Sequence, residues 1–426
     1  MTHPDMTTSS PDNCCGDFRT SRRRLLAGMG AVAGAAVTSS MIGGAFREVA
    51  YGATTANPNV LVVLSLRGGA DGLSLVVPHG DPAYRAARPD IAVPTDRLVA
   101  RDAYFGLHPK LAPLAPLWSA GSFGAVHAVG LPQPDRSHFS AMEVVEDADP
   151  GSSERRGWIN RLVGAMGTSD PAEAVQLGGS LIPTALYGPS PVLGMNSLAD
   201  LTFVGGAAST PESIASTRAL WQGRTGSLAQ GVASAVETVQ RFGNLASVEP
   251  APRNGAVYPY SSLGTVLENT AHLIRSEIGA RVITIDQGDW DMHVGLGNLD
   301  WGDMQRNADD LARSLAAFMT DLGTLTGRVT VVTISEFGRR VEQNGAGGLD
   351  HGYGNCMLLL GGGVSGGTVH GQWPGLGTAK LVDGDLRVTR DYRSVFAEIV
   401  QARFPEVSVP AVFPDFVPET IGSMTP

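Results

Sequence analysis

The apolar positions along the chain fall into two kinds of run. Short continuous runs rich in branched residues predict strands buried on both faces of a sheet, and the first of them, Asn59–Leu66, ends in a glycine-rich turn. Similar runs follow at residues 123–129, 281–285, 329–334 and 356–360. Between them, helical spacing of apolar residues predicts helices at 137–148, 155–166, 261–278, 304–322 and 391–403, and one within 210–242. Strands that alternate with helices predict an α/β fold with a doubly wound, mostly parallel sheet.

The segment from about residue 178 to 260 breaks this alternation. It is rich in Gly, Pro, Ser and Ala on both sides of its helix, which predicts an insertion or cap on the main domain. No repeat of solenoid period is visible. We therefore expect one α/β domain over residues 57–422, with a cap or insertion segment at about 178–260.

The first residues predict an export signal. Arginines precede a weakly apolar, Gly/Ala-rich stretch from Leu25 to about Ile42, and small residues follow around 50–56, in the order of a secretory signal. Ser21, Arg22 and Arg23 lie where a twin-arginine signal needs them. The alternative is a membrane anchor, but glycines and hydroxyl residues dilute the stretch, and no other run approaches the roughly 20 apolar residues of a span. We expect residues 1–56 to be a twin-arginine signal peptide and the mature protein to be exported by that translocon without a stable membrane span.

Charge and cysteine content narrow the classes of partner. Removal of residues 1–56 takes away five basic and four acidic residues, so the net charge of −10 becomes −11. An acidic chain without Lys/Arg clusters is a poor binder of nucleic acid or anionic membranes. Cys14 and Cys15 leave with the signal, so Cys356 is the one mature thiol and no intramolecular disulfide can form.

Polar residues gather just after the predicted strands, where open α/β sheets place their sites. They occur in five segments that read RGGADGLS, DRSHFSAMEVVE, DQGDWDMH, SEFGRR and GGLDHGYGN. Carboxylates and imidazoles from separate loops are typical of a metal site. The candidate residues are Arg67, Asp71, Ser137, Asp291, His293, Glu336, Arg339, Asp350 and His351.

Each candidate also has a structural explanation. Asp71 in a glycine-rich turn is often turn chemistry, Ser137 is a typical helix N-cap, and Glu336 can pair with Arg339 or Arg340. The joint placement of the five loops at one sheet edge favours a site.

These motifs, together with DYRSVFAEIV near the C-terminus, resemble the domain of unknown function family 1501, from about Val60 to about Phe404. That family is grouped with the alkaline phosphatase-like superfamily of phosphatases, sulfatases and nucleotide pyrophosphatases. Its members typically carry export signals, and it has no established activity.

The resemblance implies a role for each candidate. Asp71 resembles the superfamily's first metal-ligating Asp, Ser137 its nucleophile, and Asp291, His293 and His351 further ligands. Glu336 lies where relatives place an Asp-His pair, and Tyr353 where family members commonly have a second His, so one or two metal ions (Zn, Mn, Mg or Ca) fit. Asp350 adds a carboxylate, and Arg67 or Arg339 would bind the oxygens of a small anionic ester.

Two functions follow. The first is an exported, metal-dependent hydrolase of phosphate or sulfate esters that uses Ser137 as nucleophile. The alternative is a non-catalytic exported surface binding or assembly protein that keeps the fold. A redox enzyme is disfavoured, because no mature strand precedes a dinucleotide-binding fingerprint.

Overall fold

The computed structural model describes residues 58–425, apart from 169, 180, 199–210, 227, 230, 231, 234, 235, 237–239, 241, 243, 244 and 246–249. The expected signal peptide at residues 1–56 lies outside the described residues. The expected cap or insertion at 178–260 lies partly outside them, and it stays a prediction.

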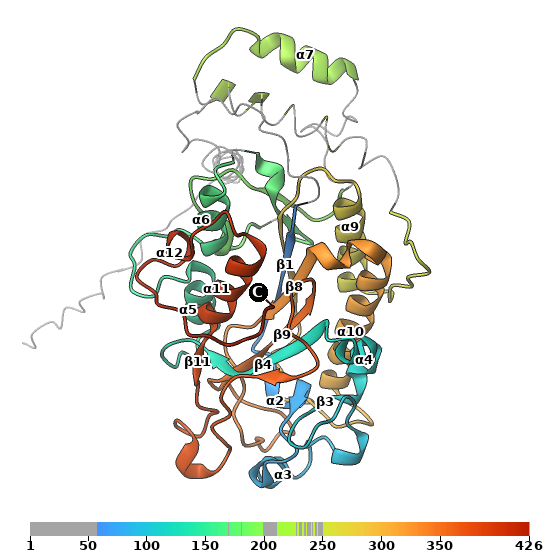
Figure 1. The fold of residues 1–426 in the computed structure, drawn as a ribbon, viewed down its shortest axis with the longest axis vertical. Coiled ribbons are helices and arrows are strands. Elements are labelled where there is room, and N and C mark those ends of the chain that lie inside the picture. Colours follow the sequence, from blue (N-terminus) through green and yellow to red (C-terminus); the bar gives the residue numbers. More distant parts are fainter. Residues whose placement is uncertain are drawn as a thin grey trace, which may run out of the picture. The chain divides into compact units, whose positions relative to one another are not determined.

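A nine-stranded sheet forms the centre of the described fold (Figure 1). The strand order is β10-β4-β9-β8-β1-β7-β5-β6, and β11 pairs with β4. The strands are β1 Val60–Leu66, β4 Phe123–Gly130, β5 Ala174–Leu177, β6 Leu193–Met195, β7 Val282–Gln287, β8 Val329–Ile334, β9 Asn355–Gly361, β10 Val369–His370 and β11 Arg390–Asp391. A separate antiparallel pair joins β2 Val76–Val77 to β3 Gly106–Leu107.

The sheet is parallel except at β9. Strand β1 pairs in parallel with β7 and β8, whereas β9 runs antiparallel to both β8 and β4. The start of β9 therefore lies at the sheet edge where β1, β7 and β8 end. The expectation of a doubly wound, mostly parallel α/β sheet is confirmed.

Alternate residues of β1 enter two different cores, because successive side chains of a strand point to opposite faces. Val60, Val62 and Leu64 pack with α9 and α10, while Leu61 and Val63 pack on the face of α5, α6, α11 and α12. All seven residues of β1 are buried, as expected for a strand covered on both sides.

The helices are α2 Gly72–Leu75, α3 Pro82–Ala87, α4 Ala115–Ser119, α5 His138–Asp147, α6 Trp158–Ala165, α7 Pro211–Trp221, α9 Ser262–Arg275, α10 Asp303–Leu322, α11 Tyr392–Arg403 and α12 Val409–Val412.

Element boundaries differ from the expectations where backbone contacts intervene. The helix expected from residue 155 begins at Trp158, because Gly157 is extended and its N–H donates to the carbonyl of Tyr187 at 2.9 Å. The helix expected to reach residue 278 ends at Arg275, and Glu277 has a positive φ of 53°. The short strands β5 and β6 were not expected, and β6 falls inside the expected insertion. Among the described helices, none is both long and apolar enough to cross a membrane.

Candidate metal centre

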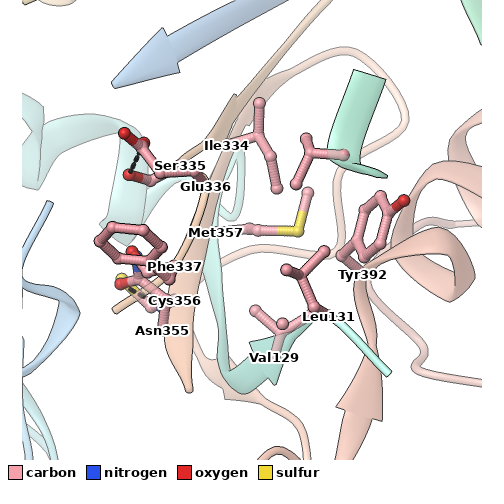
Figure 2. A pocket seen from close by; sticks show the side chains of 12 residues that line it. Val129, Leu131, Ile334, Ser335, Glu336, Phe337, Asn355, Cys356, Met357 and Tyr392 are labelled. Carbon is pink, nitrogen blue, oxygen red and sulfur yellow. Dashed lines mark hydrogen bonds between the residues drawn. The ribbon is translucent and has the colours of Figure 1, made fainter. Parts of the chain in front are cut away.

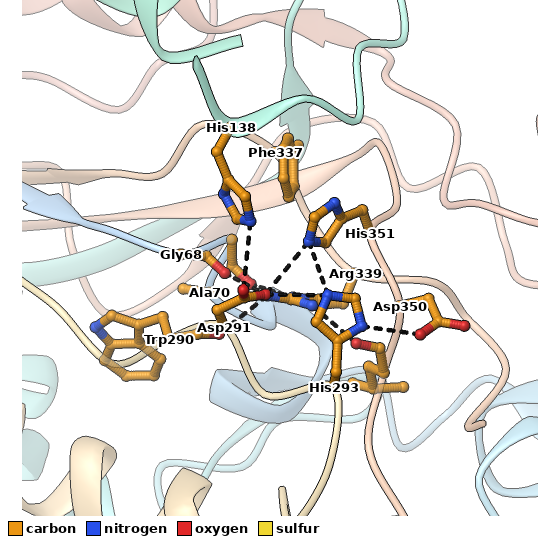
Figure 3. A network of polar contacts seen from close by, with 12 residues as sticks. Gly68, Ala70, His138, Trp290, Asp291, His293, Phe337, Arg339, Asp350 and His351 are labelled. Atoms are coloured by element: carbon orange, nitrogen blue, oxygen red, sulfur yellow. Dashed lines mark hydrogen bonds and ion pairs between the residues drawn. The ribbon is translucent and has the colours of Figure 1, made fainter. Parts of the chain in front are cut away.

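Four connecting segments meet at the sheet edge where β1, β7 and β8 end and β9 begins: those after β1, before α5, after β7 and between β8 and β9 (Figure 3). Gly68 and Gly69 have positive φ angles of 114° and 71°, which suit glycine. A Cβ on Gly68 would lie 2.6 Å from the backbone nitrogen of Asp291, and one on Gly69 would lie equally close to the ring of Phe337. The glycines therefore allow the loops after β1, β7 and β8 to touch.

Three histidines direct their Nε2 atoms at one aspartate. His293 Nε2 lies 3.2 Å from Asp291 Oδ1, His351 Nε2 lies 3.3 Å from the same oxygen, and His138 Nε2 lies 3.5 Å from Asp291 Oδ2. Ligand atoms of His138, Asp291 and His351 all lie within 4.8 Å of one another. The residues come from α5, the loop after β7 and the loop before β9. Figure 3 shows the rings of His138 and His351 turned toward Asp291.

The other ring nitrogen of each histidine is bound to an acceptor. His138 Nδ1 lies 2.8 Å from Glu336 Oε1, His293 Nδ1 lies 2.9 Å from Asp350 Oδ1, and His351 Nδ1 lies 2.8 Å from the carbonyl of Arg136. Carboxylates and carbonyls accept hydrogen bonds, so these contacts assign the N–H of a neutral ring to Nδ1. The Nε2 lone pairs are then free and face Asp291.

This arrangement fits a divalent cation better than an empty polar cluster. The Nε2 atoms of His293 and His351 are 2.9 Å apart, so a proton or a cation must lie between them. His138 Nε2 is buried without a hydrogen-bond partner among the described residues. Tetrahedral zinc ligands at roughly 2.1 Å from the ion lie about 3.4 Å from one another, and the Nε2 atoms of His138, His293 and His351 lie 3.5, 3.2 and 3.3 Å, respectively, from an oxygen of Asp291. Histidines whose other nitrogen is held by a carboxylate or carbonyl are the usual ligand geometry.

Arg339 holds Asp291 in place. Its side chain is 1% exposed, and Nη2 lies 2.5 Å from Asp291 Oδ1. Burial alone would raise the pKa of Asp291, but the hydrogen bond and charge of Arg339 outweigh it and hold the pKa below its usual range. Arg339 also donates to the carbonyls of Gly69 and Leu349 at 2.6 and 2.8 Å. Arg339 therefore links these loops through its hydrogen bonds, and its guanidinium is not free to bind a substrate.

Asp71 is not part of this group. Both of its oxygens bind Arg88, at 2.5 and 3.0 Å, and the two side chains are 3% and 0% exposed. Burial would raise the pKa of Asp71, but the charge and hydrogen bonds of Arg88 lower it overall. The carboxylate is thus already neutralised by an internal cation.

Glu336 and Asp350 contact histidines. Glu336 is buried, and besides His138 it accepts hydrogen bonds from the N–H of Gly68 at 2.9 Å and from Ser335 Oγ at 3.0 Å. Asp350 is exposed, and its hydrogen bond to His293 lowers its pKa. Both carboxylates orient ligand rings in this structure.

Ser137 and Arg67 lie on the α5 side of the site. Ser137 is the exposed N-cap of α5, and its Oγ accepts a hydrogen bond from the N–H of Ser140 at 3.5 Å. Arg67 Nη2 contacts Glu146 at 2.6 Å and Arg67 Nε contacts Asp286 at 2.9 Å, so two of its three guanidinium nitrogens already meet carboxylates.

His138 was missed in the sequence. It follows Ser137 directly, and attention to the serine as a nucleophile or cap hid the imidazole beside it. His138 could have been found from the sequence, because the first residue of a helix that begins at the sheet edge projects toward the same loops.

A small cavity lies behind Glu336, among Ile334, Met357 and Tyr392 (Figure 2). Its volume is about 10 Å³, which is room for one water molecule at most. It cannot hold a substrate. An incoming molecule would instead reach the cluster from the side of Asp291 and His293, whose side chains are 48% and 41% exposed.

Residues 270–394 match the model of a family described as "Protein of unknown function (DUF1501)". This match supports the resemblance found in the motifs and covers those that contain Asp291, Glu336 and His351. No curated protein matches the sequence.

Several solved structures are similar to this chain at low identity. The zinc-bound C-terminal periplasmic domain of EcEptC from Escherichia coli is 11% identical, with a TM-score of 0.38, over 86% of this chain and 89% of that one. Phosphonoacetate hydrolase from Sinorhizobium meliloti 1021 is 13% identical, with a TM-score of 0.28, over 67% and 57%. Alkaline phosphatase from the Antarctic bacterium TAB5 is 10% identical, with a TM-score of 0.28, over 73% and 94%. Similarity at this level does not assign an activity.

Proposed function

We propose that the protein is an exported, metal-dependent hydrolase of phosphate or sulfate esters. Its residues 270–394 resemble a family of unknown function. One observation carries the proposal. The Nε2 atoms of His138, His293 and His351 face the carboxylate of Asp291, and each ring is oriented through Nδ1. In the proposal these four residues hold a divalent cation.

The donor set favours zinc over the harder cations. Imidazole nitrogens suit zinc and related transition metals, whereas magnesium and calcium prefer oxygen ligands. When bound, such an ion would polarise an ester oxygen as a Lewis acid.

The position of α5 supports an anionic substrate. His138 is the first residue of this helix, so the cluster lies at a helix N-terminus. Backbone N–H groups and the helix dipole there favour negative charge. A phosphoryl or sulfuryl group near the cluster would gain from both.

In the proposal, Ser137 is the nucleophile. Its Oγ would form the bond to phosphorus or sulfur while the organic group of the ester leaves, and water would later free the serine. The hydroxyl now serves as a helix cap through a long 3.5 Å contact, a contact that is easily given up.

The proposed site of action is outside the cytoplasm. The support is the paired Arg22 and Arg23 before a Gly-rich apolar stretch. A protein that folds before export can acquire its metal in the cytoplasm.

The test is turnover by the purified full chain with aryl phosphates, phosphodiesters and sulfates, each with added Zn, Mn, Mg or Ca. We expect turnover that needs metal, and we expect Ser137→Ala to abolish it. Ser140→Ala is the matched control, because Ser140 lies in the same helical turn and is equally exposed. If Ser137→Ala retained full turnover, the serine mechanism would be wrong. If no ester were hydrolysed by metal-loaded protein, the non-catalytic binding protein would be the better description.

A further inference from the structure

If the proposed function holds, the charges around the cluster determine which esters the site accepts. We infer that the site binds one divalent ion, and that it prefers esters with a single negative charge, such as phosphodiesters and sulfate monoesters, over doubly charged phosphate monoesters.

The first step is the number of ions. The free donor atoms of the cluster are three Nε2 atoms and Asp291 Oδ2, since Asp291 Oδ1 already meets Arg339 at 2.5 Å. A catalytic zinc ion takes three protein donors and keeps a fourth position for water or substrate, so these four donors suffice for one ion and not for two. Asp71 cannot serve a second ion while both of its oxygens bind Arg88. Arg88 is fully buried and also donates to the carbonyls of Val341 and Arg340 at 2.9 and 3.0 Å, which fixes it there.

The second step concerns the arginines that a substrate might meet. Arg67 is bound to Glu146 and Asp286. Arg136 is the residue directly before Ser137. Both hydrogen bonds of its guanidinium are made to Asp385. Arg339 is buried beneath Asp291. Each of these cations is therefore neutralised by a carboxylate of the chain.

The third step is the balance of charge at the cluster. Asp291, Glu336 and Asp350 bring three negative charges and Arg339 brings one positive charge, and a histidine that binds a metal ion does so as the neutral ring. One divalent ion brings the total to zero. A neutral site with a helix N-terminus stabilises one negative charge well. A second charge on the substrate would lie near exposed Asp350 and Asp291, and the guanidinium of Arg339 is already bound to Asp291.

Metal content tests the number of ions without any activity measurement. Metal-free full chain is titrated with zinc, and bound zinc is measured by elemental analysis. We expect one zinc per chain, and two would overturn the inference. The double variant Asp71→Leu/Arg88→Met replaces the buried ion pair with apolar residues, a change that proteins often tolerate. The folded variant should keep its zinc, whereas loss of zinc would mean that Asp71 is a ligand. If circular dichroism shows that the variant does not fold, the zinc content of the unchanged chain decides.

Three p-nitrophenyl esters with the same leaving group test the charge preference: the phosphate, the methyl phosphate diester and the sulfate. At about pH 8 the phosphate monoester carries two charges and the others carry one. We expect kcat/KM for at least one singly charged ester to exceed that for the monoester by about tenfold or more. A preference for the monoester would refute the inference and leave the hydrolase proposal standing. Absence of turnover with all three would instead count against the hydrolase proposal, and the zinc count would still be decided.

Discussion

At the residue scale, each histidine of the cluster divides its two nitrogens between support and binding. Nδ1 is held by Glu336, Asp350 or the carbonyl of Arg136, and Nε2 faces Asp291. The supporting groups fix the ring orientation before any cation arrives. Replacement of a histidine should therefore have a different effect from replacement of a group that binds its Nδ1.

Replacement of a ligand should remove the metal. In His351→Ala, one of four donors is lost, so bound zinc and the zinc-dependent rise in melting temperature should both disappear. A ligand bound only by the native state contributes about 2.7 kcal/mol at a hundred times its Kd. Differential scanning calorimetry with and without zinc measures the effect. His370→Ala is the control, because His370 contacts Ser365 and not the cluster. An unchanged zinc effect in His351→Ala would exclude this histidine as a ligand.

Replacement of a support should weaken metal binding without abolishing it. Glu336→Gln keeps the shape of the side chain and an oxygen for His138 and Gly68, which both use Oε1, but it removes the negative charge behind His138 and replaces Oε2, the acceptor for Ser335, by an N–H donor. Zinc affinity should fall by roughly 10- to 100-fold, as is typical when a group behind a ligand is altered. A competition titration with a chelator measures this. The exposed Glu342→Gln should have no effect, and equal affinities for the two variants would contradict the assigned role.

At the element scale, the longer strands and helices could be predicted because their apolar patterns are long and regular, whereas short strands such as β5 and β6 could not. The predicted strand at 329–334 coincides with β8. The pairing of Asp71 with Arg88 could not be predicted, since the sequence shows neither which way Arg88 points nor that it is buried. The direction of β9 was equally hidden. Asp291, His293 and His351 were found because their motifs follow or precede strands, whereas His138 lay on a helix.

Helix α5 carries an acidic residue at an unfavourable end. Asp147 is its last residue, where the helix dipole disfavours a carboxylate. Burial, and then the charge of Glu143, raise the pKa of Asp147 to about 6. Because the folded-state pKa lies above the unfolded value, the folded protein keeps a proton that the unfolded chain releases between about pH 4 and pH 6. Stability should therefore fall as the pH rises through this window.

Asp147→Asn should remove that part of the pH dependence. The melting temperature of the wild type, relative to the variant, should decrease between about pH 4 and pH 7. Asp96→Asn, at an exposed position, serves as control and should follow the wild type. A constant difference between Asp147→Asn and the wild type across this range would refute the prediction.

At the scale of the whole molecule, the predicted twin-arginine signal at residues 1–56 precedes the described fold in the sequence. We expect Arg22→Lys/Arg23→Lys to leave folding and zinc content intact but to stop export, because lysine keeps the charge and not the guanidinium groups. Fractionation of cells should find the variant in the cytoplasm. Arg19→Lys, in the same segment but outside the pair, should be exported normally. Normal export of the double variant would mean that a different route carries the protein.

The position of β1 in the sheet governs the order of assembly. Leu61 pairs with Val282 and Val60 pairs with Val329, so the first strand to leave the ribosome has no partner until most of the chain has been synthesised. Such distant pairings fold slowly, and unpaired apolar strands aggregate readily. We therefore expect refolding of the chain to be slow and to compete with aggregation. His138, Asp291 and His351 also lie far apart in the sequence, so their cluster can form only after these distant segments have met.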